Sequence, residues 1–135
     1  MSSVFSAPYA ARMAMDGDYS TICATNLAPV SWLSVRVQAG TPIGHVAMFN
    51  RRDAYSSLLG SFEVWLGTSF GDISAPAVFC GAAAYDASLE PAPYVLWCGG
   101  VSNRPYVTVI RVGPGEGYMT IAELEPFVAM LPPSP

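Results

Sequence analysis

Short apolar runs separated by glycine and proline restrict the fold of this chain more than any other feature. The 135 residues include 12 Gly and 12 Pro, and no window shows a sustained helical period. Breaks of this kind, between runs with strand-like alternation, predict an all-β sandwich with hairpin and Greek-key connections. We expect the strands to span residues 32–38, 43–49, 61–66, 76–80, 93–98, 105–112 and 118–124.

The length and composition predict one folded domain. A chain of 135 residues can bury one core, and with 52% hydrophobic and only 12% charged residues it is not a disordered segment. We assign residues 1–130 to this domain. The last residues, Leu131-Pro132-Pro133-Ser134-Pro135, favour extended polyproline structure and resemble the start of a stiff linker. The domain is therefore expected to be a module of a larger protein.

The charge argues against nucleic-acid binding. The formal net charge is -4, and the six basic residues are all arginine, with Arg51-Arg52 as the only basic pair. No apolar run approaches the roughly 20 residues that span a bilayer. The first residues lack the charged and apolar regions of a signal peptide. We expect either a mature domain without its signal or a piece of a longer chain.

The chain has three cysteines, so at least one cannot form a disulfide within the chain. Cys80 and Cys98 each end a predicted strand, so a disulfide between them is geometrically reasonable. Such a bond would stabilise the fold and would imply an oxidising compartment. The alternative is a pair of buried free thiols.

Nothing in the sequence predicts catalysis. His45 is the only histidine, so no metal site with two histidines and no histidine dyad can form. No serine lies in a G-x-S-x-G motif, which marks the nucleophile of many hydrolases. We therefore predict no catalytic residue and no enzyme activity.

Several segments, in the same order, resemble the discoidin-like (coagulation factor 5/8 type C) family, and within it the F-type, fucose-binding lectins. The resemblance implies a jelly-roll β-sandwich of about eight strands that binds ligands on loops at one end. By comparison with the family, His45 faces outward as a structural residue. The segments that carry the resemblance are Ala14-Met15-Asp16-Gly17-Asp18, Cys23-Ala24-Thr25, Ser31-Trp32-Leu33-Ser34-Val35, the stretch from Cys98-Gly99-Gly100 through Pro105-Tyr106-Val107-Thr108-Val109, and Tyr118-Met119-Thr120-Ile121-Ala122-Glu123-Leu124-Glu125.

The sugar-binding motif of the F-type lectins is only half present. Arg51 and Asp53 match the start of the R-x-D-x4-R/K pattern, but Leu58 stands at the second basic position and the expected histidine falls near Thr25. The family's fucose specificity therefore does not carry over. Arg51 either contacts a ligand or ties the loop down through Asp53. The expected ligand surface comprises Thr25, Asn26, Arg51, Arg52, Asp53 and Tyr55.

The family's calcium site is the better match. The resemblance places the carboxylates of Asp16 and Glu123 on a structural Ca²⁺, which prefers hard oxygen ligands. The alternative is an ordinary Asp-Gly turn beside a glutamate. Ala122 also replaces the family cysteine that would pair with Cys23, so we expect Cys23 to be buried as a free thiol or to bond another chain. The residues expected to offer carbonyl oxygens are Met13, Asp18, Thr21 and Ala122.

These observations predict an extracellular, non-enzymatic module for glycan recognition or adhesion, with a glycan or glycoprotein as partner. One alternative keeps the fold but not the sugar, as a structural module that joins neighbouring protein subunits in a coat, filament or cell wall. Another is a carbohydrate-binding appendage of an enzyme in the same polypeptide. Membrane binding is not expected, because only Leu58-Leu59 beside the arginine pair suggests an apolar spike.

Overall fold

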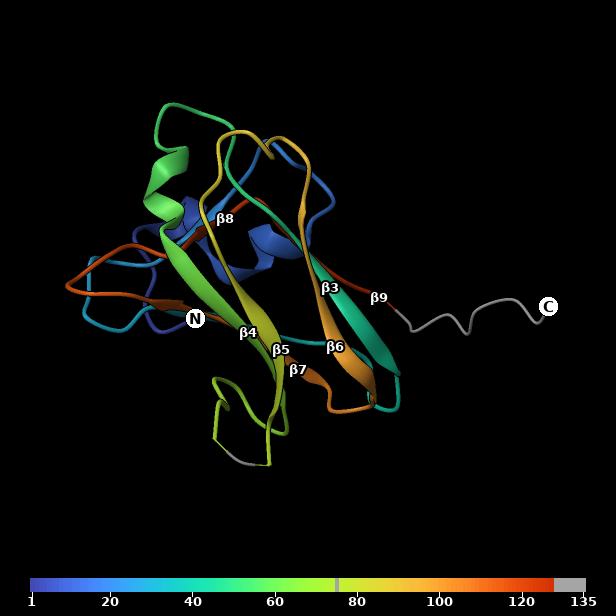
Figure 1. The fold of residues 1–135 in the computed structure, drawn as a ribbon. Helices are drawn as coiled ribbons and strands as arrows, with labels where there is room; N and C mark the ends of the chain where they lie inside the picture. The colour runs from blue at the N-terminus through green and yellow to red at the C-terminus, as the bar shows by residue number, and fades with distance from the viewer. Residues whose placement is uncertain (75, 128–135) are drawn as a thin grey trace.

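A computed structural model describes residues 1–74 and 76–127 (Figure 1). The predicted linker at 131–135 and the end of the predicted domain at 128–130 lie outside the described residues. Within them the chain is mostly β-structure, with three short 3-10 helices: η1 (Ala7–Tyr9), η2 (Ala11–Met15) and η3 (Ser56–Leu59). The strands are β1 (Cys23–Ala24), β2 (Trp32–Arg36), β3 (Ile43–Phe49), β4 (Ser61–Gly67), β5 (Val78–Ala84), β6 (Tyr94–Ser102), β7 (Tyr106–Val112), β8 (Thr120–Ile121) and β9 (Glu123–Phe127).

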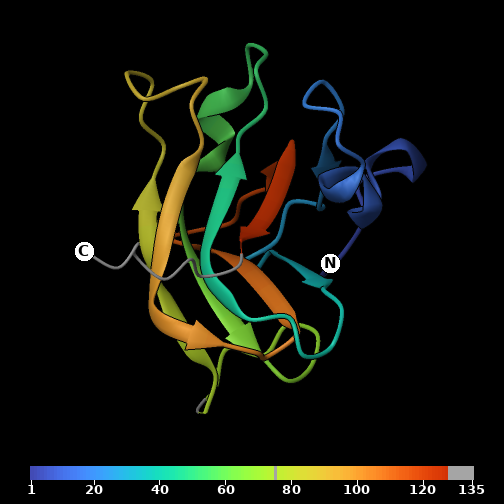
Figure 2. The same ribbon diagram turned by 90° about the vertical axis from the view of Figure 1, so that its right-hand side faces the viewer.

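Two antiparallel sheets form the sandwich (Figure 2). One sheet has the order β2-β7-β4-β5 and the other the order β6-β3-β9, while β1 and β8 make a small separate pair. The alternating apolar residues of the strands fill the space between the sheets, which confirms the predicted jelly-roll β-sandwich. The largest fully buried side chains are Phe62, Leu33, Ile43, Met48, Leu59, Leu66, Met119, Ile121 and Leu124.

Six of the seven predicted strands are present, although the one predicted at 76–80 is β5 at Val78–Ala84, and the seventh prediction needs a correction. Residues 118–124 do not form one strand: β8 pairs with β1, and β9 pairs with β3 and continues to Phe127. Ala122 lies at the break, where its backbone N–H donates to the carbonyl of Phe49 at 2.8 Å. The chain therefore changes pairing partner within a stretch that neither glycine nor proline interrupts.

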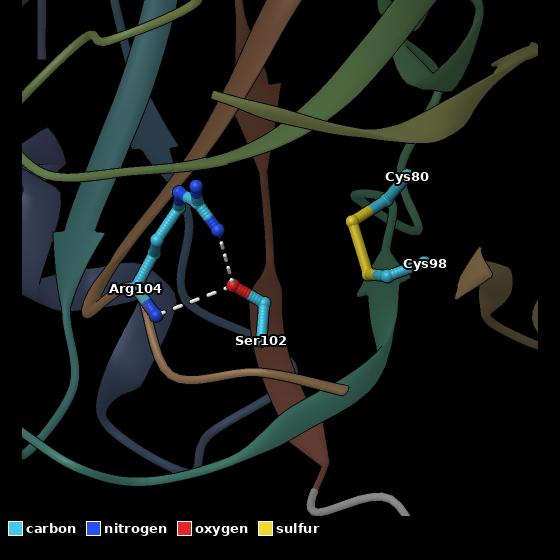
Figure 3. Close-up of a disulfide and its surroundings, with 4 residues drawn as sticks. All are labelled: Cys80, Cys98, Ser102 and Arg104. Carbon is cyan, nitrogen blue, oxygen red and sulfur yellow. Dashed lines mark hydrogen bonds between the residues drawn. A yellow bond between two sulfur atoms is a disulfide. The ribbon is translucent and has the colours of Figure 1, made fainter. Parts of the chain in front are cut away.

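The predicted disulfide between Cys80 and Cys98 is present (Figure 3). It joins β5 to β6, the facing edge strands of the two sheets. Val64 pairs with Gly81 while Trp65 pairs with Phe79, so Cys80 is the extra residue of a β-bulge. In the same close-up, Arg104 donates to the Ser102 hydroxyl at 3.3 Å where β6 ends.

Cys23 is a buried free thiol, as expected. Burial raises the pKa of its thiol to about 12, so the thiolate needed for reaction is rare at neutral pH. Alkylation of the unfolded chain without reductant should therefore add one label, and alkylation after reduction should add three. Intact mass gives the count. Three labels without reductant would show that the disulfide does not form in solution.

Several loops meet at one end of the sandwich. The loop that contains η3 and the loop between β5 and β6 lie together at the top of Figure 1, whereas the β4–β5 connection lies at the opposite end. Asn50 joins the two upper loops, because its amide donates to the Ser56 carbonyl at 2.8 Å and to the Glu90 carboxylate at 2.9 Å. This buried anchor fixes the base of the loop that carries Arg51.

Candidate functional site

Arg51 follows β3 directly and forms a two-point ion pair with Asp53. Its Nε donates to Oδ1 of Asp53 at 2.7 Å and its Nη2 donates to Oδ2 at 2.6 Å. The Arg51 side chain is only 15% exposed, against 53% for Asp53. The hydrogen bonds from Arg51 hold the pKa of Asp53 below its usual value, so the carboxylate is charged at neutral pH. The tie to Asp53, one of the two alternatives predicted for Arg51, is thus observed, and contact with a ligand stays a prediction.

Aromatic rings flank both arginines of the loop. The Arg51 guanidinium lies 5.3 Å from the centroid of the Tyr55 ring, and Tyr55 is exposed. The Arg52 guanidinium lies 5.5 Å from the ring of Tyr19, which belongs to the loop after η2. Both distances fall within the roughly 6 Å of cation–π contacts. Two loops distant in sequence therefore meet through charged and aromatic side chains.

A cleft of about 600 Å³ lies between these two loops, and residues of both loops line it. We call it the polar cleft. Tyr19 is held at its edge, because its hydroxyl donates to Oε1 of Glu125 at 2.5 Å and its ring packs 4.6 Å from that of Phe49. The cleft thus has a fixed aromatic wall and charged groups of both signs. Its lining residues are Gly17, Asp18, Tyr19, Ser20, Ile22, Arg51, Arg52 and Asp53.

The sequence predicted only part of this cleft. Arg51, Arg52 and Asp53 were predicted to contact a ligand, and they share its wall. Asp18 was assigned only to the calcium site, and Tyr19 was not included in the expected ligand surface. Both residues belong to the turn of the predicted calcium site, and no sequence pattern indicated that this turn lies beside the Arg51 loop.

Thr25 was wrongly predicted to face a ligand. It is fully buried, and its hydroxyl is used internally: it accepts from the Met119 N–H at 2.8 Å and donates to the Asn26 carbonyl at 3.1 Å. Asn26 is exposed but lines neither the polar cleft nor the smaller pocket beside it. Its backbone N–H donates to the Ser3 hydroxyl at 2.9 Å. Asn26 therefore connects the N-terminal segment to the sandwich, and Thr25 connects β1 to the segment before β8.

The turn after η2 meets β9 at the predicted calcium position. The N–H of Gly17 donates to Oε2 of Glu123 at 2.9 Å, which clamps the turn against the strand. Asp16 accepts from the Thr21 hydroxyl at 2.5 Å and from the Asp18 N–H at 3.0 Å. The fold thus brings together the two carboxylates that the family resemblance paired.

Glu123 is the buried carboxylate beside this turn, and other carboxylates lie near it. It is 2% exposed, and its Oε1 has no hydrogen-bond partner among the described residues. Burial raises the pKa of Glu123, and the carboxylates of Asp16, Glu125 and Asp18 raise it further. A buried, partly unsatisfied carboxylate near other negative charges is costly unless a proton or a cation neutralises it. Ca²⁺ at this position would supply that charge.

The remaining ligands of such an ion would be carbonyl oxygens and water. Among residues 1–74 and 76–127, no group of three or more His, Cys, Asp or Glu side chains is arranged to hold a metal. A site with two carboxylates suits calcium, which readily takes backbone carbonyls. Of the carbonyls expected to contribute, that of Asp18 already accepts from the Thr21 hydroxyl at 3.0 Å. Met13 lies on η2, which packs against β9, and Ala122 directly precedes β9.

His45 and Phe70 lie away from the polar cleft. His45 is on the outer face of β3 as expected, between the rings of Trp97 at 4.4 Å and Phe127 at 4.7 Å. Its Nδ1 makes no hydrogen bond within the described part of the chain. Phe70 packs 4.7 Å from Tyr106, on the β4–β5 connection at the opposite end. Neither His45 nor Phe70 contributes to the site.

The comparisons with known proteins bear on the fold. The sequence matches no protein-family model and no curated protein. The structure is similar to that of the lectin domain of lectinolysin in complex with Lewis b antigen, with 21% identity and a TM-score of 0.75 over 96% of this chain and 90% of that one. It is also similar to the fucolectin from striped bass (Morone saxatilis) serum, with 19% identity and a TM-score of 0.78 over 93% of this chain and 44% of that one.

A third similar structure is the family 32 carbohydrate-binding module from C. perfringens NanJ in complex with galactose. It is 16% identical, with a TM-score of 0.69 over 91% of this chain and 88% of that one. The chain therefore has the discoidin-like, galactose-binding-domain-like fold found in F-type lectins, F5/8 type C domains and carbohydrate-binding modules. Within the described residues, no helix is long and apolar enough to cross a membrane.

Proposed function

We propose that this chain is a non-enzymatic glycan-recognition module that binds a saccharide in the polar cleft. The observation that carries the proposal is the position of Arg51, which Asp53 and Tyr55 hold at the wall of a cleft of about 600 Å³. This volume lies within the roughly 300–1,000 Å³ of pockets that enclose small ligands. Similar structures that carry Lewis b antigen or galactose support the same class of ligand.

The chemistry of the cleft suits a polyhydroxylated ring. Arginine donates hydrogen bonds in a fixed fork, and carboxylates accept them from hydroxyl groups. Arg51 and Asp53 offer both functions from one loop, and Asp18 adds a second carboxylate from the opposite wall. The ring of Tyr19 presents an aromatic wall against which the apolar face of a sugar could pack.

A structural Ca²⁺ held by Asp16 and Glu123 forms the second part of this proposal. The carbonyl oxygens of Met13, Asp18, Thr21 and Ala122 are the candidates to complete its shell. The turn at residues 16–21 supplies a wall of the polar cleft as well as Asp16, so an ion there would also keep that wall in place. The unsatisfied Oε1 of Glu123 supports such an ion.

The setting that we propose is extracellular or on a cell surface. The Cys80–Cys98 disulfide supports it, because disulfides persist in oxidising compartments. A protein–protein assembly module remains the second candidate. It is favoured by the exposed Trp97 and Val95 on the outer face of β6, together with Phe127 on β9.

Replacement of Arg51 by alanine tests the glycan proposal. Loss of a hydrogen bond from a charged donor costs about 1.5–3 kcal/mol, so we expect saccharide binding to weaken roughly 10- to 150-fold. A glycan array would identify the ligand of the wild type, and calorimetry would measure the change in Kd.

The matched control is Arg104→Ala, since Arg104 is also half-buried and bonded to a near neighbour, Ser102. It lies in the β6–β7 connection, outside the polar cleft. The two variants should differ in binding by at least tenfold. The glycan proposal would be wrong if the wild type bound no glycan or if Arg51→Ala bound as well as the wild type. The assembly module would then be the better-supported function.

A further inference from the structure

A second, smaller pocket of about 270 Å³ adjoins the polar cleft. Arg51 and Ile22 line both spaces, so they form the shared wall. Three aromatic rings pack edge to face around the second pocket: Phe5 lies 5.8 Å from Tyr9 and 6.0 Å from Tyr118. We call this space the aromatic pocket. It is smaller than the roughly 300–1,000 Å³ of pockets that enclose whole ligands, so it suits a substituent better than a complete sugar.

Two polar groups in the wall of the aromatic pocket have hydrogen-bonding capacity left. Thr120 is 2% exposed, and its Oγ1 makes no hydrogen bond within the described part of the chain. Its register partner on β1 is Ala24, whose methyl group offers no hydrogen-bond partner. The Nε and Nη2 of Arg51 donate hydrogen bonds to Asp53, and no described residue accepts one from its Nη1. Buried polar groups normally have hydrogen-bond partners, so we expect a ligand group to bond the Thr120 hydroxyl.

We infer that the aromatic pocket receives the acetamido group of an N-acetylated sugar whose ring lies in the polar cleft. This inference rests on the proposed function. The methyl end of an acetamido group would pack among Phe5, Tyr9 and Tyr118. Its carbonyl would accept from Arg51 Nη1 or from the Thr120 hydroxyl, and its N–H would donate to Thr120 Oγ1. A simple methyl substituent would fill the same space but would leave Thr120 unpaired.

Free monosaccharides provide the test. Ligand-observed NMR titrations of the full chain with N-acetylglucosamine and N-acetylgalactosamine should give at least tenfold tighter binding than glucose and galactose. Fucose should bind more weakly than the acetamido sugars, because its methyl group offers no hydrogen bond. Equal affinities for acetamido and parent sugars, or a preference for fucose, would overturn the inference while leaving the glycan-binding proposal intact. If none of these sugars and no glycan binds, both fall.

Thr120→Val separates the hydroxyl from the shape of the pocket. The change keeps the branched side chain and removes only the hydrogen-bonding group. The ratio of N-acetylglucosamine to glucose affinity should fall about 3- to 10-fold, the effect of one neutral hydrogen bond. The melting temperature should stay level or rise, because the hydroxyl has no partner to lose. Thr41→Val, in the β2–β3 connection outside both spaces, should leave the ratio unchanged. An unchanged ratio in Thr120→Val would exclude the assigned role of Thr120.

Discussion

Removal of the Cys80–Cys98 disulfide is expected to lower the free energy of unfolding by about 3 kcal/mol. The bond closes a loop with a sequence separation of 18. In the chain-entropy model, closing a loop of this length restricts the unfolded chain by that amount. For a domain of this size the loss corresponds to a fall in Tm of roughly 12 °C. Urea unfolding of a Cys80→Ala/Cys98→Ala variant would measure it.

The position of the bond gives it a further role. The edge strands β5 and β6 belong to different sheets and share no ladder of backbone hydrogen bonds. The disulfide is thus a covalent link between the sheets at this edge. Reductant should lower the stability of the wild type toward that of the double variant and leave the variant itself unchanged. A wild type that unfolds identically with and without reductant would contradict this role.

The strand positions could be predicted because the turns are encoded locally. The connection at residues 113–117 is an example: Gly113 and Gly115 have φ angles of 140° and 79°, which other residues rarely adopt. Together with Pro114, these glycines mark the end of β7 in the sequence. The break between β8 and β9 has no such signal. Neither glycine nor proline interrupts residues 118–124, and only the change of pairing partner from β1 to β3 divides them.

The same distinction applies to the candidate site. Arg51 and Asp53 are two residues apart, so their ion pair follows from local geometry and was one of the two alternatives predicted for Arg51. The burial of Thr25 depends on Met119, 94 residues further along the chain. The placement of Tyr19 depends on Glu125 across a separation of 106 residues. Contacts between the two ends of the chain are set by tertiary packing, and no local pattern indicates them.

The aromatic pocket was missed for that reason. Phe5 reaches it because its backbone N–H donates to the Ala24 carbonyl at 2.9 Å, which places the N-terminal segment beside β1. Tyr118 arrives from the other end of the sequence, just before β8. Each aromatic residue taken alone would be expected to pack in the core. Their arrangement around an open pocket became visible only in the folded chain.

Addition of calcium is expected to raise the stability of the wild type by a comparable amount. An ion present at 100 times its Kd, and bound only by the folded chain, adds about 2.7 kcal/mol. The corresponding rise in Tm is roughly 10 °C. The physical reason is the unpaired charge of Glu123, whose Oε1 has no hydrogen-bond partner among the described residues and whose pKa is raised by burial and by nearby carboxylates. Thermal melts in a chelator and across a calcium titration would measure the shift.

Glu123→Gln distinguishes a calcium site from an ordinary turn. Glutamine keeps the shape of the side chain and an oxygen that can accept from the Gly17 N–H, but it removes the buried charge. The variant should therefore be at least as stable as the wild type in chelator and should lose most of the calcium response. Glu116→Gln, an exposed carboxylate in the 113–117 connection, should keep the full response. If the wild type melts at the same temperature in calcium and in chelator, the turn is held by its hydrogen bonds alone. If Glu123→Gln responds like the wild type, any calcium that binds does so elsewhere.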